Sequence, residues 1–159
     1  MLLDLDALDL GEITYALSDQ AAYEHCWLIH SQTGEIVYWS AETGIDGHAK
    51  IDLEDLDPEL ICIRPLPSWV WYQDMEDFAE GITDDRAGRG LARAIQGRGA
   101  FRRFKDQLSD EYPNLLPAWY AFSEARALRR AVEWLAEEEL VDQEAADRYQ
   151  TEHPEPDLP

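Results

Sequence analysis

The sequence lacks the features of membrane proteins and of disulfide-stabilised proteins. It has no run of about 18 apolar residues, so no segment is suited to cross a bilayer. Two cysteines in 159 residues cannot form a disulfide scaffold. The first residues, 1–6, carry none of the basic side chains that open a secretory signal peptide. These absences predict a cytoplasmic protein that makes no membrane contact.

Basic side chains are also scarce. The chain has 13 Lys and Arg against 34 Asp and Glu, which gives a formal net charge of −21. Long-range repulsion at this charge excludes a general polyanion-binding surface. Apolar residues, in contrast, make up 45% of the chain and aromatic residues 11%. This composition excludes intrinsic disorder and, at this length, predicts one folded domain.

The few basic residues are concentrated in one stretch. Residues 86–130 hold ten basic and four acidic side chains, whereas the rest of the chain holds three basic and 30 acidic ones. Within this stretch, residues 86–105 carry seven basic side chains and no acidic one. The sequence therefore predicts a molecule with regions of opposite charge, which favours head-to-tail self-association at low salt.

The N-terminal half predicts an antiparallel sheet. Residues 23–29 and 36–39 are rich in β-branched, aliphatic and aromatic types, and residues 31–35 supply the turn of a hairpin. Residues 60–63 form a third apolar run that ends at Pro65, which cannot donate a ladder hydrogen bond. We expect at least three strands.

The C-terminal half predicts helices, because apolar residues recur there with a period of 3.6. The acidic residues between 74 and 80 fall away from the apolar face and are predicted to face solvent. The expected helices span residues 9–19, 68–82, 84–96, 100–111, 114–139 (with Asn114 as N-cap) and 141–150. The predicted common core of the long helices comprises Trp71, Phe78, Phe101, Phe104, Trp119, Phe122, Val132 and Leu135.

These patterns predict an α+β fold in which the small antiparallel sheet packs on a C-terminal helical subdomain. We expect one domain over residues 1–150, rich in strands over about 20–67 and helical over about 70–140. Residues 151–159 contain three prolines and several acidic side chains, so they are predicted to form a flexible tail.

The run GRGAFRRFKD at residues 97–106 is the most specific of several segments that are similar to a known family. Through these segments, over about residues 23–140, the chain resembles an uncharacterised protein family (UPF) 0158 of bacteria. The resemblance implies a bacterial protein with one folded domain and implies no activity, ligand or catalytic residue. The other segments that carry it are residues 33–35, 75–78, 119–122 and 131–135.

One candidate binding site is an arginine-rich turn. Gly97, Arg98 and Gly99 precede a predicted helix whose free N-terminal amides attract phosphate or sulfate. Arg98, Arg102 and Lys105 fall on one flank of that helix, near enough to converge on such an anion. In the alternative interpretation, Gly97 ends the preceding helix in a left-handed conformation, and the arginines neutralise acidic segments of the same chain.

Other chemistries have little support in the sequence. His25 and His30 are five residues apart on a predicted strand, so they project from opposite faces and do not chelate a metal together. Cys26 and Cys62 lie in apolar runs without CxxC spacing and are predicted to be buried thiols. No nucleophile elbow, HExxH motif, P-loop or dinucleotide fingerprint is present. We therefore predict no enzyme, no cofactor and no metal.

Two hypotheses for function remain. The first is a non-enzymatic protein–protein interaction module whose acidic surface binds a basic partner, since complementary charge speeds association and selects the partner. The second is a binding module for a phosphate-bearing ligand, a nucleotide or a short RNA, at the arginine-rich turn. Net charge favours the first hypothesis, and the local basic stretch favours the second.

Overall fold

The computed structural model describes residues 2–20, 25–47 and 51–159. Its contacts divide the chain into two compact units. Unit 1 comprises residues 1–66 and 128–152, and unit 2 comprises residues 67–127 and 153–159. The α+β class is confirmed by a four-stranded antiparallel sheet in the N-terminal half and by helices that lie mostly C-terminal to it. The single domain over residues 1–150 and the packing of sheet on helical subdomain stay predictions.

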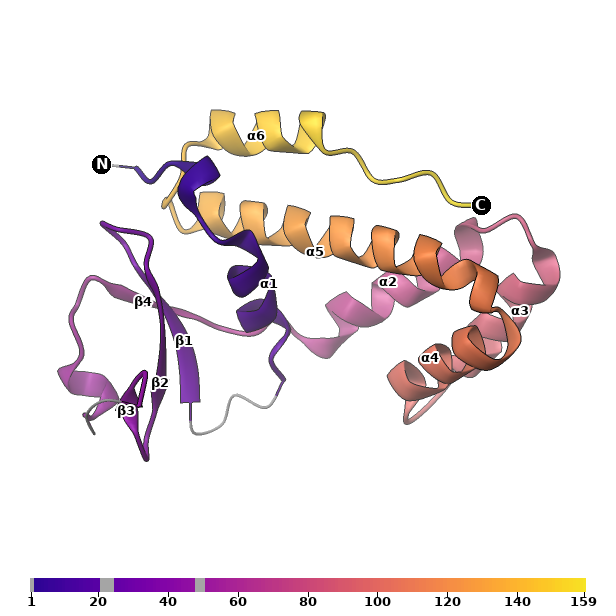
Figure 1. Ribbon diagram of the computed structural model, residues 1–159, viewed down its shortest axis with the longest axis horizontal. Helices are drawn as coiled ribbons and strands as arrows, with labels where there is room; N and C mark the ends of the chain where they lie inside the picture. Colours follow the sequence, from indigo (N-terminus) through magenta and orange to yellow (C-terminus); the bar gives the residue numbers. More distant parts are fainter. Residues whose placement is uncertain (1, 21–24, 48–50) are drawn as a thin grey trace. The chain divides into compact units, whose positions relative to one another are not determined.

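Unit 1 contains the sheet, whose strand order is β3-β2-β1-β4 (Figure 1). All neighbouring strands are antiparallel, and Leu28 of β1 lies opposite Val37 of β2 and Cys62 of β4. Tyr23 and Glu24, the predicted start of the first strand, lie outside the described residues. The strands are β1 (His25–His30), β2 (Ile36–Ser40), the very short β3 (Gly44–Ile45) and β4 (Leu60–Ile63), with a 3-10 turn η2 (Leu53–Asp55) before β4.

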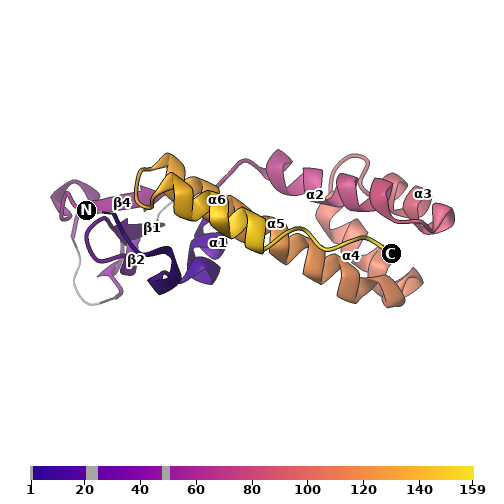
Figure 2. The same ribbon diagram turned by 90° about the horizontal axis from the view of Figure 1, so that it is seen from above.

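Helices complete unit 1. A 3-10 turn η1 (Leu5–Ala7) precedes α1 (Leu10–Ser18), where the Asp9 carboxylate accepts a hydrogen bond from the Glu12 amide and caps the helix. Ile13, Ala16 and Leu17 are fully buried and form the apolar face of α1. In both views α6 (Gln143–Glu152) lies along the last turns of α5, joined to them by the Arg129–Gln150 hydrogen bonds (Figure 1 and Figure 2).

Unit 2 is helical. It holds α2 (Ser68–Gly81), α3 (Asp85–Ala94), α4 (Ala100–Glu111), a 3-10 turn η3 (Pro113–Leu115) and the first part of α5 (Leu116–Glu137). Asp84 caps α3 by accepting the Ala87 amide at 3.1 Å. The prediction that Asn114 caps the long helix is wrong, because Pro113 starts a 3-10 turn and places Asn114 inside it.

An aromatic cluster fills unit 2. Phe104 and Trp119 lie 4.7 Å apart between ring centroids in an edge-to-face arrangement, and Phe78 and Phe122 pack beside them. The predicted common core is wrong in part. Phe101 is 43% exposed and Trp71 is half-buried, while Val132 and Leu135 are buried in the part of α5 that belongs to unit 1.

The segment after α6 makes specific contacts within unit 2, whereas the sequence predicts a flexible tail. The Thr83 amide donates to the Pro159 carbonyl at 2.7 Å, and Leu158 packs against the aromatic cluster. A Cβ atom on Gly81 would lie 2.4 Å from a Leu158 methyl carbon, so the glycine makes room for that side chain. Proline restricts the free chain, which lowers the entropy lost when this segment binds.

Candidate functional site

The arginine-rich turn lies between α3 and α4 in unit 2. Gly97 and Gly99 both have positive φ, 77° and 74°. A Cβ atom on Gly97 would meet nothing within 4 Å, so this glycine is required by the backbone conformation and not by crowding. Gly97 lies three residues beyond the end of α3, whose C-cap is Ile95, so its left-handed conformation belongs to the connecting turn and not to the helix terminus.

Arg103, which sequence reasoning missed, holds this turn closed. Its Nε atom donates to the Ala94 carbonyl at 2.8 Å, and its two terminal nitrogens donate to the carbonyls of Gln96 and Arg98. These carbonyls lie at the end of α3 and in the turn that follows it, and they would otherwise need water. The sequence signal that could have identified Arg103 is its position four residues after Gly99, because basic side chains commonly bind the last carbonyls of a helix.

The three predicted anion ligands do not share this arrangement. Arg98, Arg102 and Lys105 are all exposed. The Arg102 side chain is 90% exposed, and its Nε atom lies 3.9 Å from the Asp106 carboxylate one turn along α4. An exposed pair at this distance contributes little free energy. These side chains form an exposed basic surface over the turn and the first part of α4.

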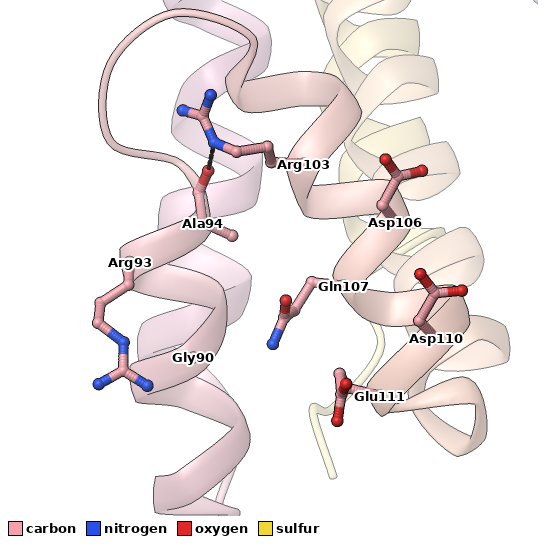
Figure 3. A pocket seen from close by; sticks show the side chains of 8 residues that line it. All are labelled: Gly90, Arg93, Ala94, Arg103, Asp106, Gln107, Asp110 and Glu111. Carbon is pink, nitrogen blue, oxygen red and sulfur yellow. Dashed lines mark hydrogen bonds between the residues drawn. The ribbon is translucent and has the colours of Figure 1, made fainter.

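A groove of about 470 Å³ lies beside the turn, between α3 and α4. In Figure 3, Gln107 points across toward α3, whereas the carboxylates of Asp106 and Asp110 point away from it. The lining carries two guanidinium groups and three carboxylates, so it has no excess of positive charge to favour an anion. The lining residues are Gly90, Arg93, Ala94, Arg103, Asp106, Gln107, Asp110 and Glu111.

A second charged cluster in unit 2 surrounds Arg126 of α5. Its guanidinium lies 3.3 Å from Asp74, binds Asp77, and donates through Nε to Glu155 at 3.0 Å. It also stacks on the Phe122 ring, 4.6 Å from the centroid. Burial disfavours the charged guanidinium, but the hydrogen bonds to Asp77 and Glu155 outweigh burial and raise its pKa.

The Arg126 cluster corrects the prediction that the acidic residues between 74 and 80 face solvent. Asp74 is only 3% exposed. A buried carboxylate needs a cation or several donors, and Arg126 supplies the cation from a position 52 residues along the chain. Arg126 therefore neutralises acidic side chains of its own unit.

Unit 1 carries a row of aromatic rings on one face of the sheet. Tyr15 of α1 contacts Trp27 edge-on at 5.6 Å, and Trp27 contacts Tyr38 of β2 at 5.0 Å. One Asp19 oxygen accepts from the Trp27 indole at 3.1 Å and lies 2.8 Å from His25 Nε2. Tyr15 is 61% exposed. These contacts hold an exposed aromatic surface in place beside a carboxylate.

The histidines and cysteines are arranged as follows. His25 binds Asp19, while His30 lies 3.5 Å from Asp57, so the two histidines have separate partners, as their positions on the strand imply. Cys26 and Cys62 are half-buried and lie on adjacent strands, so the prediction of buried thiols is wrong. Cys62 is on the edge strand β4, which leaves part of its side chain accessible.

Comparison with known proteins gives the family. The model of an uncharacterised protein family (UPF0158) matches residues 3–153. The chain belongs to this family. It is 32% identical over 133 residues to UPF0158 protein PA5073 of Pseudomonas aeruginosa, which covers 84% of each chain. The family resemblance seen in the sequence is thereby confirmed, and neither description names an activity.

No solved structure is significantly similar to the chain. Within the part of the chain that the structure describes, no helix combines the length and the apolar character needed to cross a membrane.

Proposed function

We propose that this protein is a non-enzymatic interaction module that binds a basic partner protein through unit 1. The observation that carries the proposal is the division of charge. Unit 1 holds 22 acidic and five basic side chains, whereas unit 2 holds 12 and eight. A surface with so large an excess of one sign attracts a partner of the opposite sign and repels nucleic acid and acidic proteins.

The aromatic row supplies an anchor for such a partner. Tyrosine and tryptophan are enriched among the residues that dominate binding energy at interfaces. An arginine or lysine of the partner can stack on the exposed Tyr15 ring while acidic side chains nearby bind its charge. Asp19 fixes Trp27, so the row loses little conformational entropy on binding. A nucleic-acid-binding protein, neutralised by this module, is one example of a suitable basic partner.

The phosphate-ligand hypothesis at Gly97, Arg98, Gly99, Arg102 and Lys105 has less support. Arg103 holds the turn through its carbonyls, and the neighbouring groove carries more carboxylates than guanidinium groups. Head-to-tail self-association also has less support, because unit 2 as a whole is slightly negative. Both stay predictions; the same molecular mass by light scattering at low and high salt would exclude the charge-driven association.

The proposal is tested by capture from a bacterial lysate with paired surface variants. The unit 1 variant combines Glu12→Gln with Tyr15→Ala, and the matched unit 2 control combines Asp110→Asn with Tyr120→Ala. Each removes one exposed carboxylate and one exposed tyrosine. We expect mass spectrometry to identify basic proteins that both the wild type and the control capture. The unit 1 variant should capture at least fivefold less of these proteins, and high salt should release them. Equal loss in both variants, or capture of nucleic acid alone, would contradict the proposal.

A further inference from the structure

The two cysteines lie together on one face of the sheet. Since Leu28 pairs with Cys62, Cys26 is the diagonal neighbour of Cys62. Side chains alternate along a strand, so Cys26 and Leu28 point to the same face, and Cys62 shares it. Each thiol shifts the pKa of the other, as expected of two groups that are close neighbours. Both are half-buried, so they form a dithiol that a small reagent can reach.

A diagonal pair is poorly placed for a disulfide. Diagonal neighbours in an antiparallel pair are about 7–8 Å apart, whereas disulfide-bonded residues have Cα atoms about 4.4–6.8 Å apart. Two thiolates on the diagonal can instead bind one ion that lies between them. Metal–sulfur bonds of about 2.3 Å leave the bridged sulfur atoms as far as about 4.6 Å apart.

The electrostatic surroundings favour thiolate at one member of the pair. The neighbouring Cys26 thiol acts most strongly and, together with the charge of Arg64, outweighs burial to lower the pKa of Cys62 to about 7. The Cys62 thiol and burial raise the pKa of Cys26. Arg64 comes directly after β4 and is exposed. Two thiolates around a monovalent cation carry one net negative charge, which the Arg64 guanidinium balances.

We propose that Cys26 and Cys62 form a two-thiolate site for one soft monovalent metal ion, of the class of copper(I). Thiolates are soft ligands, which suit copper(I), zinc and iron–sulfur clusters. Across residues 2–20, 25–47 and 51–159, no group of three His, Cys, Asp or Glu side chains is placed to hold a metal, whereas a structural zinc site needs four ligands. Each metal–sulfur bond forms as the thiol proton leaves to solvent, and no atom changes oxidation state.

The site is tested by titrating the full, reduced chain with copper(I) in the absence of oxygen, in competition with a coloured copper(I) chelator. The wild type should withdraw one equivalent from the chelator. Cys26→Ser and Cys62→Ser should each weaken binding at least tenfold, because one thiolate is lost in each. Ser40→Ala, a small substitution on β2 of the same sheet, is the matched control and should bind as the wild type does.

Two further measurements keep the test independent of damage to the fold. Binding by the wild type should weaken at least tenfold for each unit of pH below 7, because at least one proton is displaced from the pair. Arg64→Ala keeps both thiols and removes an exposed side chain, and it should weaken binding severalfold. A wild type that withdraws no copper(I), or a single-cysteine variant that binds as tightly as the wild type, would overturn the proposal.

Discussion

The two units treat charge in opposite ways. In unit 2, Arg126 binds carboxylates from α2 and from the C-terminal segment, and Arg103 binds backbone carbonyls. Two of its cations are thus committed to contacts inside the unit. Unit 1 has 22 acidic side chains and five basic ones, so its acidic side chains far outnumber the basic ones that could bind them. A cluster of like residues in a sequence is therefore a poor guide to a binding site until its internal partners are known.

The units also differ in where their aromatic rings lie. Unit 2 buries Phe78, Phe104 and Trp119 in its centre. In unit 1, aliphatic side chains such as Ile29 and Ile63 are buried, while the rings of the aromatic row stay half-buried or exposed. Rings that are fixed but accessible are typical of interaction surfaces. This contrast is a second reason to place the proposed partner on unit 1.

The largest expected effect is the loss of a ring from the centre of unit 2. Phe104→Ala should destabilise the protein by about 3–5 kcal/mol, because Phe104 is fully buried against Trp119 and Phe78. Phe101→Ala, one turn earlier on α4 and 43% exposed, is the matched control and should cost less than about 1 kcal/mol. Urea unfolding measures both. Equal losses would place Phe101 in the core, as its spacing alone predicts.

The next effect concerns charge inside unit 2. Arg126→Met should cost about 3 kcal/mol, because it removes the cation beside the buried Asp74 carboxylate. Adding Asp74→Asn should recover part of this loss, since the remaining group is then neutral. Urea midpoints of the two single variants and the double variant measure the coupling. Purely additive losses would mean that Asp74 does not depend on Arg126.

A smaller effect is expected at the turn between α3 and α4. Arg103→Met should cost about 1 kcal/mol, because three carbonyls lose a charged donor but can bind water at this exposed place. Arg102→Met, one residue earlier and highly exposed, is the matched control. Hydrogen exchange at the end of α3 should quicken in the first variant and stay unchanged in the second. Unchanged exchange in both would show that Arg103 does not hold the turn.

Local patterns predicted most of the elements, and long-range contacts account for most of the errors. The bounds of α4 match the prediction at both ends, because Gly99 and Pro113 lie outside an uninterrupted apolar period. Phe101 and Phe104 share that period, yet only Phe104 faces the aromatic cluster of unit 2. The apolar stripe of α4 is wider than the part of it that is buried. Asp74 is buried because of Arg126, and no pattern within α2 encodes that partner.

The candidate site was predictable only in part, for a related reason. The positive φ at Gly97 and Gly99 follows from their residue type and position. The sequence does not show which arginine turns toward the loop, since Arg102 and Arg103 differ by only about 100° around the helix and have the same chemistry. The proximity of Cys26 to Cys62 depends on the register of β1 against β4, which a gap of 36 residues does not specify.

The smallest expected effect tests the arginines that have no strong partner in the structure. Arg98→Ala with Arg102→Ala should change stability by less than about 0.5 kcal/mol, because both side chains are exposed and the Arg102–Asp106 pair is long. Thermal unfolding at low and high salt measures this loss, and titration with a fluorescent nucleotide and a short RNA at low salt measures binding.

If the turn is an anion site, charge-assisted hydrogen bonds of roughly 1.5–3 kcal/mol each are lost and binding is abolished. If these arginines compensate the acids of unit 2, the variant melts earlier at low salt, and added salt reduces the difference. We expect neither ligand to bind the wild type or the variant. The Arg103 guanidinium already donates to carbonyls of the turn, and the neighbouring groove carries more carboxylates than guanidinium groups. Tight nucleotide binding by the wild type that the double variant loses would reverse the assignment and make unit 2 the functional unit.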